Sequence, residues 1–160
     1  MGTTTLLFLI KKSGDTISHI CLAMKKRSFG KGRWNGVGGK LNEGESIESA
    51  VIRETKEEIG VHPKNFKKVA ELCFNFPEHK KHFNQTAHVY FCDEWENNPA
   101  ESEEMNPQWF HVDELPFHSM WPDDIFWLPK VLQGEIIKGN FLFGDSDNVL
   151  EHELEDIESF

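Results

Sequence analysis

Three carboxylates at helical spacing are the residues of this chain best suited to hold a metal ion. Glu54, Glu57 and Glu58 stand at positions i, i+3 and i+4, so a helix through them presents all three on one side. Like charges at this spacing destabilise an isolated helix by about 0.2–0.5 kcal/mol per pair. A hard divalent cation such as Mg²⁺ or Mn²⁺ reverses that penalty, because it prefers oxygen ligands. The alternative is a solvated, Glu-rich helix face, which is the usual meaning of a run of charges.

The residues around the carboxylates predict the helix that presents them. Ser46 is suited to the N-cap, and Gly60 is suited to the position just after the C-terminal end. Arg53 lies beside the acidic residues and can orient or neutralise one of them through a bidentate contact. Apolar or β-branched side chains recur every four residues and can face a core: Ile47, Val51, Thr55 and Ile59.

A basic and glycine-rich stretch precedes this helix. Lys25 and Arg27 belong to a run of three cations, and one of the two can face substrate phosphates; the alternative is a solvated strand end. The segment 28–39 holds five glycines, which allow close approach of the backbone to a ligand. Asn35, within that segment, can pair bidentately with a purine edge.

The remaining chain alternates strand-like and helix-like patterns around these residues. Strands are predicted over 3–12, 16–24, 67–76, 87–92, 109–112, 136–143 and 149–154, with a second helix that starts near Pro122 and ends at Gly134. The stretches 77–84 and 94–106 are polar and predict loops. Strands that flank two helices predict one α/β domain over 1–160, an α/β/α sandwich around a mixed sheet.

Composition limits the classes of partner and the location. The net charge of −10 argues against binding of polymeric nucleic acid, which needs a basic surface. The apolar run 6–10 is too short for a membrane span or a signal sequence. The three cysteines favour reduced thiols in an intracellular protein. We therefore expect a cytoplasmic protein with a small-molecule ligand and no membrane partner, and we take a monomer as the default.

The stretch 39–61 resembles the Nudix box. That motif is a Gly, five residues, a Glu, seven residues, Arg-Glu, an aliphatic residue, any residue, Glu-Glu, any residue, a Gly and an aliphatic residue. Thr55 departs from it, because its slot is usually aliphatic. The matching residues are Gly39, Glu45, Arg53, Glu54, Glu57, Glu58, Gly60 and Val61.

Further segments resemble the branch of the Nudix hydrolases that removes oxidised purine nucleoside triphosphates: 24–27, 32–36, 101–105 and 120–124. The resemblance implies the Nudix fold and hydrolysis to a nucleoside monophosphate and pyrophosphate with Mg²⁺, or Mn²⁺, as cofactor. It implies metal binding by Gly39, Glu54, Glu57, Glu58 and Glu104. It implies a catalytic set of Arg53, Glu54, Glu57, Glu58 and Glu104. It implies substrate contacts from Lys25, Phe29, Asn35, Phe74, Trp121, Asp123 and Asp124.

The adjacent pair Asp123 and Asp124 carries the expected base specificity. Burial beside Trp121 and Trp127 and mutual repulsion both raise a carboxyl pKa, so that one Asp stays protonated near neutral pH. A protonated Asp donates and an ionised Asp accepts, so the pair can read a base edge that oxidation has changed. The alternative is that both residues favour the start of the second helix.

Two other functions remain open. One is a Nudix hydrolase acting on unmodified nucleotides, ADP-ribose or dinucleoside polyphosphates, and the other is a non-catalytic nucleotide-binding domain. The chain also departs from the resembling enzymes after the loop 77–84, where they place an apolar pocket residue. Gln85 or Thr86 falls there, which affects the expected base preference more than the reaction.

Overall fold

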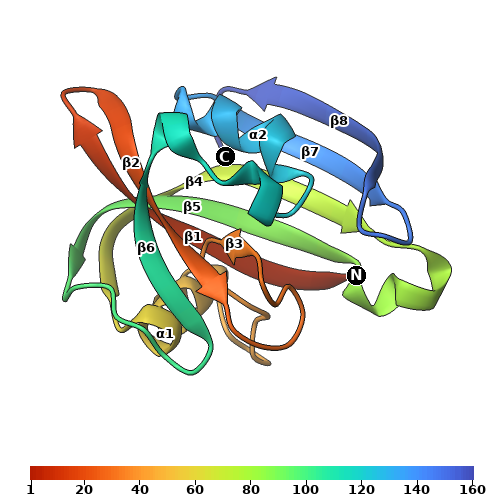
Figure 1. Cartoon of the computed structure of the whole chain (residues 1–160), viewed down its shortest axis with the longest axis horizontal. Coiled ribbons are helices and arrows are strands. Elements are labelled where there is room, and N and C mark those ends of the chain that lie inside the picture. The colour runs from red at the N-terminus through yellow and green to blue at the C-terminus, as the bar shows by residue number, and fades with distance from the viewer.

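One mixed sheet of eight strands organises the protein in the computed structural model, which describes residues 1–160 (Figure 1). The sheet has the order β3-β2-β1-β5-β4-β7-β8, and β6 pairs with β2. Two neighbouring pairs, β1 with β5 and β4 with β7, are parallel. The strands are β1 (Gly2–Ser13), β2 (Thr16–Lys25), β3 (Trp34–Asn35), β4 (His62–Asn75), β5 (Gln85–Glu96), β6 (Met105–His111), β7 (Ile136–Phe143) and β8 (Val149–Ile157).

A helix covers each face of the sheet, which confirms the predicted α/β/α sandwich. Alternate residues of β1 enter opposite cores, as the period of two in a strand requires. Leu7 belongs to the hydrophobic cluster that contains Val51 of α1 (Ile47–Ile59). Phe8 belongs to the other cluster, which contains Trp127 of α2 (Asp124–Leu132). Three short 3₁₀ helices complete the chain: η1 (Glu78–Phe83), η2 (Val112–Glu114) and η3 (Phe117–Ser119).

The helix α1 has the ends that the sequence predicts. The Ser46 side chain accepts a hydrogen bond from the backbone N–H of Ser49, and Gly60 adopts a left-handed φ of 71°. Thr55 is fully buried, and its hydroxyl donates to the carbonyl of Val51 at 2.7 Å. The polar atom in this usually aliphatic position is therefore satisfied within the helix.

Several predicted boundaries were wrong. β4 begins at His62, not at residue 67, and β5 runs to Glu96, so Glu94 lies in a strand and not in a loop. Backbone pairing extends these two strands beyond their apolar segments, with register irregularities next to Pro63. β6 begins at Met105, where it pairs with Lys25, so it is longer than predicted. The predicted loop 77–84 contains η1, and α2 begins at Asp124, after Pro122.

None of the helices combines the length and the apolar character that crossing a membrane requires. The three cysteines, Cys21, Cys73 and Cys92, are free thiols.

Candidate active site

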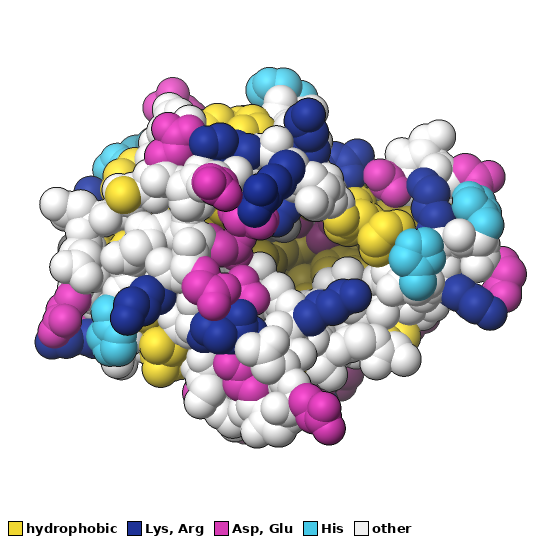
Figure 2. Space-filling view, turned by 90° about the horizontal axis from the view of Figure 1, so that it is seen from below, with side chains coloured by type: hydrophobic (Ala, Val, Ile, Leu, Met, Phe, Trp, Pro, Cys, Tyr) yellow, Lys and Arg dark blue, Asp and Glu magenta, His cyan; other side chains and the backbone are white.

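A hollow opens between the glycine-rich segment, the start of α2 and the strands β1, β4 and β5 (Figure 2). Figure 2 shows apolar side chains at its floor and both cationic and acidic side chains around its mouth. The cavity brings together residues from distant parts of the chain: Lys25, Phe29, Asn35, Gly39, Phe74, Trp121, Asp123 and Asp124. All seven predicted substrate-contacting residues are in this set.

The helix α1 places its carboxylates next to the glycine-rich segment. Glu58 is buried and accepts a hydrogen bond from the backbone N–H of Gly38 at 2.8 Å. Burial, followed by the nearby charge of Glu54, raises the pKa of Glu58 to about 7. The carboxylate of Glu54 lies against Gly39, while the Glu57 side chain is 59% exposed. The three carboxylates therefore differ in burial although they share one side of α1.

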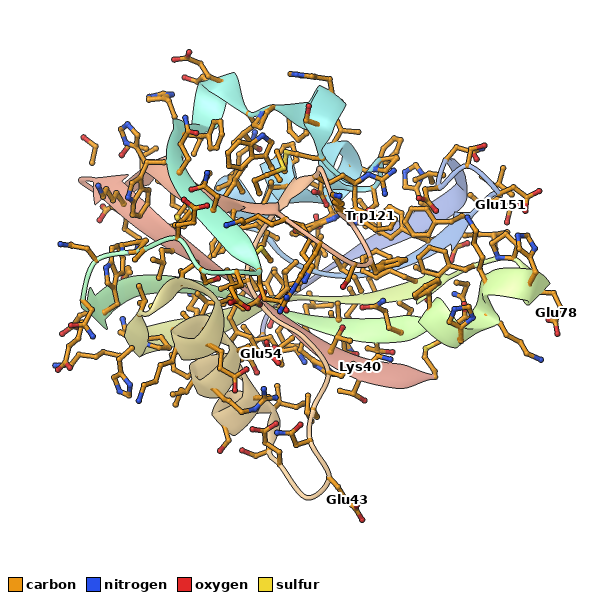
Figure 3. The ribbon with its side chains drawn as sticks, turned by 60° about the horizontal axis from the view of Figure 1, so that its bottom comes forward. Lys40, Glu43, Glu54, Glu78, Trp121 and Glu151 are labelled. Carbon is orange, nitrogen blue, oxygen red and sulfur yellow. The ribbon has the colours of Figure 1, made fainter.

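Arg53 fastens the carboxylates to the preceding loop. Its guanidinium donates to both carboxylate oxygens of Glu45, at 2.8 and 2.9 Å, and to the carbonyl of Lys40 at 3.1 Å. It also donates to Glu54 at 2.8 Å and to Glu57 at 3.3 Å. Figure 3 shows Glu54 on the helix and Lys40 on the adjacent loop. Arg53 holds Glu54 and Glu57 through these contacts. Neither Arg53 nor the predicted metal-binding carboxylates line the cavity: Glu54, Glu57, Glu58 and Glu104 lie outside it.

Glu104 lies at the other side of the acidic region and is held by two cations. Lys25 Nζ lies 2.9 Å from one carboxylate oxygen, and Arg27 lies 2.8 Å from the other. These contacts, with Lys25 first, lower the pKa of Glu104. Of the two cations that the sequence left open as phosphate ligands, Lys25 lines the cavity and Arg27 does not.

The residues present fit a hard divalent cation. No three of the acidic, His or Cys side chains converge on one point in this structure. Arg53 is paired with Glu54, and Lys25 is paired with Glu104. The buried charge of Glu58 has only one backbone N–H as a partner, and such a charge is costly without a cation. The Gly39 carbonyl accepts from Thr5 N–H at 2.9 Å and retains a second lone pair.

Aromatic side chains form the opposite end of the cavity. Phe29 stacks on Trp121 with ring centroids 4.9 Å apart, and Arg33 lies 4.1 Å above the Trp121 ring. Phe83 of η1 stacks on Phe29 at 4.1 Å. The predicted site residues did not include Arg33 or Phe83. Phe83 lies in a polar stretch that predicts a loop. The flat apolar faces of Phe29 and Trp121 are suited to contact with a nucleobase.

The two aspartates are buried at the floor of the cavity and do not cap α2. Asp123 makes no side-chain cap; instead, its Oδ2 accepts from Trp127 Nε1 at 2.7 Å. Oδ2 of Asp124 is buried without a hydrogen-bond partner. Burial raises the pKa of Asp123 and, together with the neighbouring Asp123 charge, raises that of Asp124 well above its ordinary value. Asn35 adds a free NH₂ group, because its Oδ1 accepts from Gly36 N–H.

A mixed sheet between two helices, with acidic residues on the first helix facing a glycine-rich strand connection, defines the Nudix class of proteins. The sequence matches the family described as NUDIX domain over residues 3–131, and the chain belongs to that family. It is 43% identical over 142 residues to the mouse oxidized purine nucleoside triphosphate hydrolase, a match that covers 89% of this chain and 90% of the mouse protein.

A second relative and a solved structure also match most of the chain. The zebrafish oxidized purine nucleoside triphosphate hydrolase is 43% identical and matches 88% of each chain. Among solved structures, a MutT protein from Bacillus halodurans superposes with a TM-score of 0.82 at 25% identity, over 97% of this chain and 98% of its own. Nudix hydrolases generally need a divalent metal ion, which agrees with the donor set described above.

Adjacent glycines in the site predict two different results of the same substitution. A Cβ on Gly38 would lie 1.8 Å from the Thr5 carbonyl oxygen, whereas one on Gly39 would lie 2.8 Å from a Glu54 carboxylate oxygen. Backbone cannot yield cheaply, so we expect Gly38→Ala to destabilise the fold by about 2 kcal/mol or more. Gly39→Ala should keep its melting temperature to within a few degrees and lose activity, because Glu54 must move. Thermal unfolding and turnover of both variants test this contrast, and equal melting temperatures would contradict it.

Proposed function

We propose that this protein hydrolyses oxidised purine nucleoside triphosphates, such as 8-oxo-dGTP or 2-hydroxy-dATP, to the monophosphate and pyrophosphate. The observation that carries the proposal is the buried pair Asp123 and Asp124 beside Trp121 in the cavity. The mouse and zebrafish relatives are each 43% identical to this chain over the aligned residues, and their names support the same substrate class. A bacterial relative named 8-oxo-dGTP diphosphatase, from Escherichia coli, is 35% identical over 75 residues.

The phosphates are expected to lie where Gly39 and Lys25 line the cavity, beside the carboxylates of α1, and the base at the aromatic end. Glu54, Glu57, Glu58, Glu104 and the Gly39 carbonyl would hold Mg²⁺, with Mn²⁺ as a substitute. When bound, the ion neutralises phosphate charge and activates a water molecule for attack on phosphorus. Lys25 reaches the cavity from β2 and supplies a cation toward the phosphates, while Arg53 keeps Glu54 and Glu57 in place.

The reaction consumes one water molecule and breaks one phosphoanhydride bond. A general base for this step needs a pKa near the working pH. Burial raises the pKa of Glu58 to about 7 in the ion-free site, and a bound cation would lower this pKa, so Glu58 would act as a metal ligand. Glu104 keeps its charge because Lys25 and Arg27 stabilise the ionised form.

Base recognition follows from the unequal aspartates. The Trp127 N–H favours the ionised form of Asp123, which accepts hydrogen bonds, although burial raises the pKa of both aspartates. The neighbouring Asp123 further favours the protonated form of Asp124, which donates. Asn35 contributes a further donor. A purine stacked on Trp121 therefore meets both donors and an acceptor within a dry pocket, where unmatched polar groups are costly.

The test is the rate of pyrophosphate release from 8-oxo-dGTP, 2-hydroxy-dATP, dGTP and ADP-ribose, each with and without magnesium. The proposal predicts magnesium-dependent hydrolysis with the highest kcat/KM for an oxidised purine. Preference for dGTP or ADP-ribose would support the alternative Nudix activity on unmodified substrates. Tight nucleotide binding without hydrolysis of any substrate would support a non-catalytic binding domain.

The proposed substrate also fixes the expected setting. A free nucleotide is a small-molecule partner, and the net charge of −10 disfavours a nucleic-acid polymer. Three free thiols suit the reducing cytoplasm, where we propose that the protein acts as a monomer on the nucleotide pool.

A further inference from the structure

Gln85 lies on the wall of the base pocket, at a position that the predicted site did not include. It is the first residue of β5 and the register partner of Phe74 on β4, and both line the cavity together with Thr4 of β1. Its neighbour Thr86 does not line the cavity; the Thr86 hydroxyl lies 3.5 Å from Cys73 Sγ. Of the two residues that the sequence left open at this place, Gln85 is therefore the one in the pocket.

Two hydrogen bonds fix which way the Gln85 amide faces. The backbone carbonyl of Phe83 only accepts, so the atom 3.0 Å from it is the amide nitrogen Nε2. Oε1 then accepts from the Thr4 hydroxyl at 2.9 Å. One N–H and one oxygen lone pair remain without a protein partner. Gln85 thus presents a donor beside an acceptor to a ligand, with no freedom to exchange them.

The segment that orients Gln85 is itself anchored at the pocket. Phe83 stacks on the pocket residue Phe29, and Lys80 of η1 donates to the Asp145 carbonyl at 2.8 Å in the turn between β7 and β8. Because Gln85 bonds to both β1 and η1, little conformational entropy remains for ligand binding to remove.

A donor beside an acceptor distinguishes oxidised guanine from guanine. Guanine shows two acceptors, N7 and O6, on its major-groove edge, and a Gln amide satisfies only one of them. In the 8-oxo form N7 carries a hydrogen, so the same edge shows a donor beside an acceptor. Adenine shows these groups in the reverse order, an acceptor at N7 and a donor at N6, so one fixed amide orientation matches only one of the two bases.

We infer that Gln85 is a specificity-determining residue that reads the N7 and position-6 edge of the base, and that it selects 8-oxoguanine over guanine. This inference rests on the proposed function. It leaves Asp123, Asp124 and Asn35 to the other polar groups of the base.

The test compares Gln85→Met with the wild type, because Met has a similar length and lacks the amide. We expect the ratio of kcat/KM for 8-oxo-dGTP over dGTP to fall by about ten-fold, the scale of one bidentate pair. The change should come mainly from KM for 8-oxo-dGTP. Gln85→Glu, which has no N–H to donate, should lower the same ratio. Thr86→Val, on the same strand and the opposite face, should leave the ratio unchanged.

Affinities for 8-oxo-dGMP and dGMP, measured by calorimetry, give the ratio independently of turnover. A wild type that binds both monophosphates equally, or a Gln85→Met variant that retains the wild-type ratio, would overturn the inference. An equal loss of affinity for every nucleotide would also overturn it, because that result is expected if Gln85 only connects β1 to η1. Selective binding without any hydrolysis would contradict the proposed function and uphold the role of Gln85.

Discussion

Glu58→Gln should lower kcat by at least about 10²-fold, the scale expected when a buried charged ligand is removed from a metal-assisted site. Gln keeps the size of the side chain and can still accept a hydrogen bond from Gly38, so the contact at 2.8 Å survives. The negative charge is lost, and with it the proposed metal ligand at this position. Steady-state release of pyrophosphate at saturating nucleotide and magnesium measures the effect.

The matched control is Glu43→Gln, which removes the same charge from an exposed loop. Figure 3 shows Glu43 directed away from the rest of the molecule, at the tip of the loop before α1. This variant should turn over at the wild-type rate, with an unchanged circular dichroism spectrum in both cases. A Glu58→Gln variant as active as Glu43→Gln would show that α1 does not hold the catalytic ion.

The second large effect is expected from the base pocket. Asp123→Asn and Asp124→Asn each replace a carboxyl with an amide of fixed donor and acceptor, in a site whose two carboxyls are buried. Each should lower the preference for an oxidised over a normal purine by about ten-fold or more, since one mismatched bidentate contact has about this effect. The ratios of kcat/KM for 8-oxo-dGTP over dGTP and for 2-hydroxy-dATP over dATP are the readout. Unchanged ratios in both variants would refute the role of the pair.

The same pair predicts a pH dependence of stability. Burial raises the folded-state pKa of Asp124 well above its value in the unfolded chain, so the folded protein favours the protonated carboxyl. The contribution of Asp124 to stability is therefore complete below the unfolded pKa of about 3.9 and is lost as the pH rises through the folded-state pKa. Asp124→Asn cannot ionise. It should melt above the wild type at about pH 8, and the difference should shrink toward about pH 4. A constant difference across this range would contradict the pKa shift.

Local patterns explain why the helix α1 was predictable. Its N-cap Ser46, its four-residue apolar period and Gly60 all act within one stretch of chain, and the structure confirms each. The edges of β4 and β5 were not predictable in this way, because pairing between strands extends them through charged segments. The short helix η1 lacks an apolar period of its own. Its Phe83 stacks on Phe29, which is distant in the sequence.

The site was predictable in composition and less so in its internal contacts. The sequence indicated seven residues that the structure brings to one cavity, because the family pattern fixes their order. It did not indicate that Trp127 holds Asp123, that Lys25 and Arg27 share Glu104, or that Gln85 rather than Thr86 faces the cavity. The Glu104 contacts join segments that are distant in the chain, and the position of Gln85 depends on which face of a strand is buried. The contact between Asp123 and Trp127 is local, but it forms between two buried side chains.

Mn²⁺ binding tests directly whether the acidic side of α1 holds the divalent ion. We expect to follow it by electron paramagnetic resonance in the presence of a non-hydrolysable purine nucleoside triphosphate. The wild type should bind the ion and broaden its signal, and the Gln variants of Glu54, Glu57 and Glu58 should each weaken that binding. If all three variants bind Mn²⁺ with the wild-type affinity and retain its turnover, the acidic side of α1 is a solvated surface and the reaction takes place elsewhere.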